Sequence, residues 1–173
     1  MASTLIQELE QVSMEDVAER GSSWASTSER DWQMLLVTPE LVDDLWPLAV
    51  PLLLEGKEHW EEFTSLESLK QSVTEGGLLL WLAIDRDGVF LALLTEATVY
   101  PETVSMRLVW IGGSGLDRVL EVGLSCLELW AYRHGAKRME VLGRPAWIRI
   151  LQGEGYKLKS YLLEKDISKI GVH

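Results

Sequence analysis

Three glycines lie within four residues of one another in this 173-residue chain, at Gly112, Gly113 and Gly115. An apolar segment precedes them and a long amphipathic segment follows, so they mark a turn that leads directly into a helix. Glycine adopts positive φ readily and leaves the backbone amides uncovered. The first amides of a helix have no partner within the helix and lie at the positive end of its dipole. The pattern therefore predicts a site for an anion such as a phosphate.

The predicted anion site has six members, namely Gly112, Gly113, Ser114, Gly115, Leu116 and Arg118. The turn residues and Leu116 offer backbone amides, and Arg118 lies in the first helical turn, where its charge assists. Ser114 is the predicted N-cap of the helix, with Asp117 three residues later at a capping-box spacing. Chain geometry alone is an alternative explanation for the glycines, because a tight turn requires them as well.

The elements around this turn follow from hydrophobic periodicity and from turn residues. Residues 107–111 predict a strand that ends at the turn, and the helix after the turn ends at Gly135. Further strands are predicted at residues 31–37, 78–84, 89–98, 138–142 and 156–163, and further helices at 41–52, 65–75 and 144–152. Pro47 and Pro51 are expected to bend or divide the first helix. Because hairpins are antiparallel and helical crossovers are parallel, the sheet of this α/β fold should be mixed.

Composition and charge restrict the classes of function. An apolar content of 47% with eight tryptophans indicates a globular domain, and no apolar run approaches the length of a membrane span. A net charge of −11 argues against nucleic-acid binding. The charge is uneven, since residues 1–75 hold sixteen acidic and four basic side chains, while residues 118–173 hold six acidic and ten basic ones. Because Cys126 is the only cysteine and the three histidines are scattered, we expect no internal disulfide and no metal site, in a cytoplasmic protein.

The first 30 residues differ from the rest of the chain. They are polar and serine-rich, which predicts an N-terminal arm over residues 1–30 and one folded domain over residues 31–173. Such an arm is typical of a segment that binds a partner. Some of the early tryptophans are expected to be exposed interface anchors, although an irregular core is the alternative; they are Trp24, Trp32, Trp46 and Trp60.

The order of elements, with the glycine turn between the fourth strand and the following helix, resembles the GCN5-related N-acetyltransferase (GNAT) superfamily over about residues 31–167. In that family a turn of pattern Arg/Gln-x-x-Gly-x-Gly/Ala holds the pyrophosphate of acetyl-CoA. The matching segment here is Trp110 to Gly115, in which Trp110 replaces the Arg or Gln. The resemblance implies a mixed, mostly antiparallel sheet flanked by helices, with acetyl-CoA as the cofactor.

The same resemblance implies further positions. The family often takes a general base from the third or fourth strand, which leaves Glu96 and Glu102 as catalytic candidates; a surface carboxylate is the alternative for each. The family also places a tyrosine general acid in its short fourth helix, where this chain has Trp147 or Ile148, and neither side chain can deliver a proton. The fourth and fifth strands must separate to admit a pantetheine arm.

Residues 141–151 also resemble small GNAT-like proteins from the structural-gene regions of tailed phages, such as the internal core protein of short-tailed coliphages. This second resemblance implies a phage-encoded virion or assembly protein with a degenerate acetyl-CoA site, located in the host cytoplasm or in the virion. Virion proteins would be its partners, bound through residues 1–30 and exposed tryptophans, and an oligomer is compatible with this role. The alternative is an active acetyl-CoA-dependent N-acetyltransferase that acts on a small-molecule or protein amine.

Overall fold

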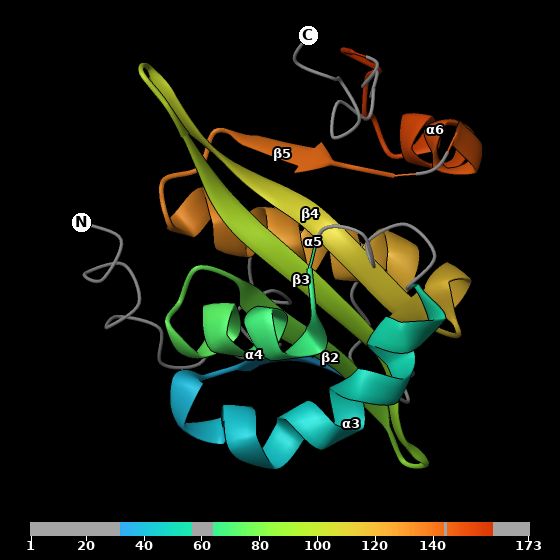
Figure 1. Cartoon of the computed structure of the whole chain (residues 1–173). Helices are drawn as coiled ribbons and strands as arrows, with labels where there is room; N and C mark the ends of the chain where they lie inside the picture. The colour runs from blue at the N-terminus through green and yellow to red at the C-terminus, as the bar shows by residue number, and fades with distance from the viewer. Residues whose placement is uncertain (1–31, 57–63, 144, 161–173) are drawn as a thin grey trace, which may run out of the picture. The chain divides into compact units, whose positions relative to one another are not determined.

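A computed structural model describes residues 32–56, 64–143 and 145–160, apart from the side chains of residues 118, 121, 145 and 146. In chain order the elements are β1 (Trp32–Val37), η1 (Pro39–Leu41), α3 (Val42–Glu55), α4 (Leu66–Thr74), β2 (Leu79–Asp85), β3 (Gly88–Tyr100), β4 (Thr103–Gly113), α5 (Leu116–Arg133), β5 (Arg138–Val141) and α6 (Pro145–Gly153). The chain divides into two compact units, one up to Leu142 and one from Gly143 onward. The second unit contains α6, and the first contains all the other elements (Figure 1).

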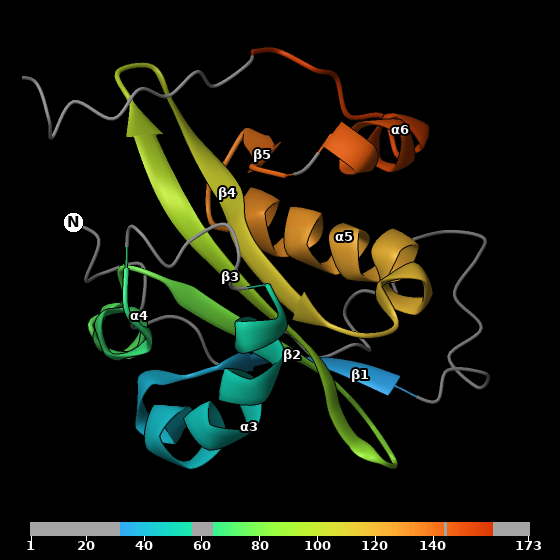
Figure 2. The ribbon, with the colours of Figure 1, turned by 45° about the vertical axis from the view of Figure 1, so that its right-hand side comes forward.

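The sheet has the strand order β1-β2-β3-β4-β5. Each of the first four strands pairs antiparallel with the next one, whereas β5 is parallel to β4, to which α5 connects it. Helices cover both faces of the sheet: α3 and α4 lie on one face, here called the front face, and α5 lies on the rear face (Figures 1 and 2). This architecture confirms the predicted α/β fold class with a mixed, mostly antiparallel sheet.

The front face holds the main core. Leucines of β2 and β3 pack there against α3 and α4, and Trp46 of α3 and Trp110 of β4 belong to the same cluster. On the rear face Trp81 of β2 donates a hydrogen bond to Thr95, at 3.0 Å, and meets Trp130 of α5 edge to face. Strand alternation explains the division, since Leu80 and Leu82 face the front while Trp81 between them faces the rear.

Two of the four early tryptophans are buried, so the core alternative holds for them and they are not exposed anchors. Trp32 and Trp46 are each only 7% exposed, because Trp32 lies in β1 beside Phe90 and Trp46 of α3 packs into the front core. Trp24 and Trp60 lie outside the described residues.

Three local expectations also need correction. The α3 helix is one continuous element with Pro47 and Pro51 inside it, so the prolines do not divide it. Both prolines are exposed, so the lost backbone hydrogen bonds face solvent. The N-cap of α5 is Gly115, with φ of +70°, and Ser114 does not cap it. The strand expected at residues 156–163 is wrong over residues 156–160, which form no regular element, and its remaining residues lie outside the described part.

Gly112 allows α3 to approach β4 closely. A Cβ atom at Gly112 would collide with the carbonyl group of Leu52 and lie 3.2 Å from the Cα of Leu53, both in the last turns of α3. These neighbours are backbone atoms, which cannot rotate away. The contact between helix and strand thus requires glycine at this position.

We therefore expect Gly112→Ala to destabilise the first unit by about 2 kcal/mol or more, because overpacking against backbone forces α3 away from the sheet. Urea denaturation followed by tryptophan fluorescence measures the change. Gly153→Ala is the matched control, since a Cβ atom there has no neighbour within 4 Å and its expected effect is below about 1 kcal/mol. Equal stability of the two variants would contradict the close approach of α3.

Candidate functional site

A β-bulge interrupts β4. Leu94 of β3 is opposite Trp110, but the next residue, Thr95, is opposite Leu108, so Val109 is an extra residue on β4. A bulge of this kind bends its strand and leaves the extra residue outside the regular ladder.

The pairing of β5 with β4 ends at the bulge. The two strands are in register from Ser105 to Leu108, and the amide of Leu142 donates the last hydrogen bond, to the carbonyl of Leu108 at 3.2 Å. Beyond Leu108 the register with β5 ends, and Ile111, Gly112 and Gly113 have no partner on the β5 side among the described residues. We call these three residues the free edge of β4. The pairing of β4 with β5 is therefore not full-length and does not close the gap that the GNAT resemblance requires between these strands.

The glycine turn connects the free edge to α5. Gly113 has φ of +109°, and a Cβ atom there would collide with the carbonyl oxygen of Phe90 on β3. The amide of Ser114 donates to that same carbonyl at 3.0 Å. Gly113 and Ser114 therefore have a clear structural role in fastening the turn to β3, and the amide of Ser114 is already engaged.

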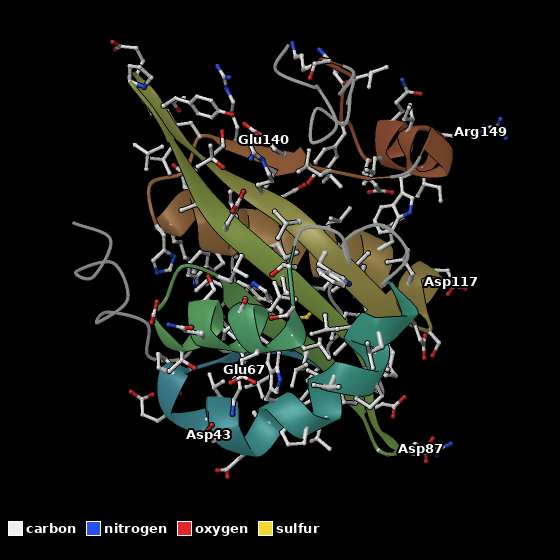
Figure 3. All side chains as sticks on the ribbon, viewed as in Figure 1. Asp43, Glu67, Asp87, Asp117, Glu140 and Arg149 are labelled. Atoms are coloured by element: carbon white, nitrogen blue, oxygen red, sulfur yellow. The ribbon has the colours of Figure 1, made fainter. Side chains whose placement is uncertain are left out.

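The amides that fit an anion are those of the first turn of α5. Gly115, Leu116 and Asp117 occupy the N-cap and the first two helical positions, whose amides have no intrahelical acceptor. They suit a phosphate, although the exposed carboxylate of Asp117 lies in the same turn and opposes a second negative charge (Figure 3). The side chain of Arg118 lies outside the described residues. Of the predicted members, Gly115 and Leu116 therefore offer amides at the start of the helix, and Asp117, which was not among them, offers a third. Binding of an anion there stays a prediction.

Trp110, at the position where the family has Arg or Gln, does not point toward this turn. Its indole Nε1 donates to the carbonyl of Leu53, in the last turn of α3, at 3.1 Å, and the side chain is buried in the front core. The side chain thus serves the packing of α3 on β4 and is not placed to bind a pyrophosphate.

A network of polar side chains lies at the other end of β4. Arg107 donates from Nη1 to Glu96 of β3 at 3.1 Å, and from Nε and Nη2 to Glu140 of β5 at 3.0 and 2.8 Å. Its Nη2 also donates to the hydroxyl of Tyr100 at 3.2 Å, and that hydroxyl donates to both oxygens of Glu140, at 3.0 and 3.2 Å. We call these four residues the Arg107 network. It joins three strands, and Figure 3 shows Glu140 on β5, well apart from Asp117 at the start of α5.

Strand alternation places the network on the front face, and Figure 3 shows its member Glu140 on β5, away from α3 and α4. Glu96 shares its face with Leu94, two residues earlier on β3, and Leu94 belongs to the front core. The side chains are partly accessible, at 23% for Arg107, 35% for Glu96 and 27% for Glu140. A ligand that approaches the front of the sheet at this end of β4 therefore meets these groups.

Arg107 and Glu140 stabilise each other's charged forms. Burial alone would raise the pKa of Glu140, but hydrogen bonds from Arg107 and Tyr100 outweigh it, so the pKa lies below its usual value. The hydrogen bond to Glu140 likewise raises the pKa of Arg107 above its usual value, against the effect of burial. Glu140 is thus a firmly held carboxylate, with little tendency to take a proton near neutral pH.

The two predicted catalytic carboxylates have different surroundings. Glu96 lies in β3 and is ion-paired with Arg107, whereas Glu102 is exposed in the turn between β3 and β4. The sequence analysis missed Arg107, Tyr100 and Glu140. A signal was present, because the turn at Pro101 and Glu102 fixes a hairpin register in which Arg107 is opposite Glu96.

The second unit carries the segment where the GNAT resemblance implies a tyrosine. Trp147 and Ile148 lie in α6 and are half-buried, and the ring of Trp147 lies 3.5 Å from the place of a Cβ atom on Gly143. In the described ranges no group of His, Cys, Asp or Glu residues is arranged to hold a metal ion. No helix of the described part is long and apolar enough to span a membrane.

Comparisons with known proteins place the fold. No protein-family model matches the chain, and no curated protein does. Among solved structures, a probable acetyltransferase is 16% identical, with a TM-score of 0.60 over 78% of this chain and 98% of its own. An aminoglycoside N-acetyltransferase in complex with CoA is 11% identical, with a TM-score of 0.58 over 79% and 95%. A GNAT family acetyltransferase from Staphylococcus aureus is 14% identical, with a TM-score of 0.53 over 80% and 100%.

At these identities the similarity establishes the fold alone, and this chain has the GNAT fold. The resemblance to phage internal core proteins gains no support from these structures and stays a prediction. The N-terminal arm, residues 1–30, lies outside the described residues, so its binding of partners also stays a prediction.

The charge state of Glu140 predicts a pH-dependent stability. A carboxylate whose pKa is lowered in the folded state stabilises the fold above the ordinary glutamate pKa, and this stabilisation is lost as pH falls through the folded-state pKa. We expect Glu140→Gln to lower the free energy of unfolding by about 1 kcal/mol at pH 7, and the difference from wild type to shrink below about pH 4. Thermal denaturation between pH 3 and 7 measures it, with the exposed Glu102→Gln as control. A difference that does not change with pH would refute this assignment.

Proposed function

We propose that this chain is an acetyl-CoA-dependent N-acetyltransferase that acts on a primary amine of a small molecule or a protein. The observation that carries the proposal is the end of β4–β5 pairing at the bulge, which leaves the free edge of β4 beside the turn into α5. The similarity to acetyltransferase structures, one of them in complex with CoA, supports it.

The residues of this chain fit the coenzyme in two places. The first-turn amides of α5, at residues 115–117, would hold the pyrophosphate, and the free edge of β4 offers backbone groups to the pantetheine arm. When bound, acetyl-CoA supplies an acetyl group activated as a thioester.

Glu96 is the carboxylate best placed to accept a proton from the acceptor amine. An ammonium group must lose a proton before its nitrogen can act as a nucleophile. Glu140 accepts hydrogen bonds from Arg107 and Tyr100 on both of its oxygens, whereas Arg107 contacts Glu96 through Oε1. Glu96 therefore retains more acceptor capacity than Glu140, and it lies nearer the bulge along the hairpin than Glu102 does.

The virion role remains the competing prediction. Its support comes from residues 1–30 and from exposed tryptophans, but the arm lies outside the described residues and Trp32 and Trp46 are buried. No observation of the described fold favours it over catalysis.

Binding of acetyl-CoA is the first test. Calorimetric titration should give a micromolar dissociation constant, which corresponds to about −8 kcal/mol. Substitution of Gly113 is unsuitable as a probe, because it would strain the turn against β3. Ser114 is exposed, so Ser114→Glu adds a negative charge beside the first turn of α5 without a steric conflict, and it should weaken binding by about fivefold.

The matched control is Ser114→Ala, which keeps the backbone and adds no charge; its affinity should stay within about twofold of wild type. Equal affinities of the Glu and Ala variants would place the pyrophosphate elsewhere. Absence of any heat and of any thermal shift at millimolar acetyl-CoA would overturn the proposed function.

The proposed role of Glu96 as the proton acceptor leads to a second prediction. With a panel of primary amines and a thiol-release assay, Glu96→Gln should lower kcat by about 100-fold, because loss of a general base typically has that effect. Its affinity for acetyl-CoA should not change. Glu102→Gln is the control and should retain kcat within about twofold. Full activity of Glu96→Gln would show that another group takes the proton.

A further inference from the structure

Arg107 lies one ladder step before the end of β4–β5 pairing. It is paired in register with Glu140, and the next pair, Leu108 with Val141, is the last before the free edge. On its other side Arg107 is in register with Glu96. One guanidinium group therefore contacts the last paired part of β5 and the proposed general base on β3.

The attachment of β5 to β4 depends on few backbone contacts. β5 has only four residues, and the hydrogen bonds at its two ends run from the amide of Lys137 to Val104, at 2.9 Å, and from the amide of Leu142 to Leu108, at 3.2 Å. A parallel pair of this length is weak. The partly buried contact between Arg107 and Glu140, through two nitrogens, is consequently a large part of what holds β5 next to the bulge.

We propose that Arg107 is a positioning residue that fixes the point at which β5 leaves β4 and, through the same guanidinium group, the orientation of the Glu96 carboxylate. The role in orienting Glu96 rests on the proposed function, whereas the hold on β5 does not. The geometry of the guanidinium group explains why one residue performs both tasks: Nε and Nη2 face Glu140 while Nη1 faces Glu96. A lysine ammonium has no such fixed directions.

The two contacts of Arg107 should have separable effects. Loss of the contact with Glu140 loosens β5, which affects the free edge and hence the binding of acetyl-CoA. Loss of the contact with Glu96 leaves β5 in place and affects proton transfer, and so kcat. Loss of Arg107 should affect both the binding of acetyl-CoA and kcat.

The test compares Glu140→Gln, Arg107→Met and Arg107→Lys with Asp43→Asn. The last variant is the control, since it removes the exposed ion pair between Asp43 and Lys70, at 2.6 Å, which lies on α3 and α4 and away from β5. Hydrogen exchange of the Leu142 amide, without any ligand, reports the hold on β5. We expect it to be about tenfold faster in Glu140→Gln and Arg107→Met than in wild type and unchanged in Asp43→Asn.

Kinetics then separates the two contacts. Glu140→Gln should raise the dissociation constant of acetyl-CoA about fivefold with a smaller change in kcat, whereas Arg107→Met should change both by about fivefold or more. Arg107→Lys, which keeps the charge near Glu96, should recover part of kcat and not the exchange protection of Leu142. A purely structural role would not produce this split.

Two results would overturn the inference: unchanged exchange at Leu142 in Glu140→Gln and Arg107→Met, or identical kinetic defects in all three network variants. Failure of wild type to bind acetyl-CoA would instead refute the proposed function and the role toward Glu96. The exchange comparison would still decide whether Arg107 holds β5, so the two failures are distinguishable.

Discussion

A single extra residue in β4, Val109, sets the geometry on which the site depends. Arg107 and Trp110 are three residues apart, so strict alternation would place them on opposite faces of the sheet. Both face the front, because the bulge between them shifts the alternation by one residue. One strand can therefore place a buried indole under α3 and an accessible guanidinium further along the same face. The bulge is also the point at which β5 stops following β4.

The C-terminal end of α3 depends on the same part of β4. The last carbonyls of a helix lack intrahelical partners, and Trp110 satisfies one of them by donating to Leu53. The backbone of α3 reaches this position because Gly112 has no side chain. Packing thus explains why Trp110 stands at the position where the resemblance to the GNAT superfamily predicts Arg or Gln. The presence of Trp110 does not by itself show that the turn into α5 has lost its affinity for anions, since the amides of that turn belong to the backbone.

Much of the fold could be predicted from local patterns. The parts that could not be predicted are those that depend on contacts between distant segments. Hydrophobic periodicity and turn residues correctly indicate the mixed sheet and the order of elements from β1 to α6, but not the strand expected after α6. The turn at residues 101–102 even fixes the pairing of Glu96 with Arg107. By contrast, nothing in the local sequence marks Val109 as a bulge, because a β-branched residue suits a regular strand equally well. The place where β5 ends its pairing was therefore not predictable.

The candidate site follows the same division. The glycines could be recognised as a turn, but the reason for Gly112 lies in α3, about sixty residues earlier in the chain, and that for Gly113 in a carbonyl of β3. Trp32 and Trp46 proved to be core residues because they are buried, and burial depends on the packing of whole elements, which local sequence does not show. Glu140 escaped notice because its partner lies across a helical crossover, and no short-range pattern relates residues 107 and 140.

The balance of charge at the start of α5 bears on whether the anion site is functional. The amides of the first turn act on a bound phosphate at hydrogen-bond distance, where the N-terminal end of a helix carries roughly half a positive charge. The Asp117 carboxylate carries a full negative charge, but it is exposed, so water and salt weaken its repulsion. Contact interactions with directed donors outweigh a screened charge in the same turn. We therefore propose that the first turn of α5 binds an anion despite Asp117, with an affinity that depends on ionic strength less than that of a site built from surface lysines.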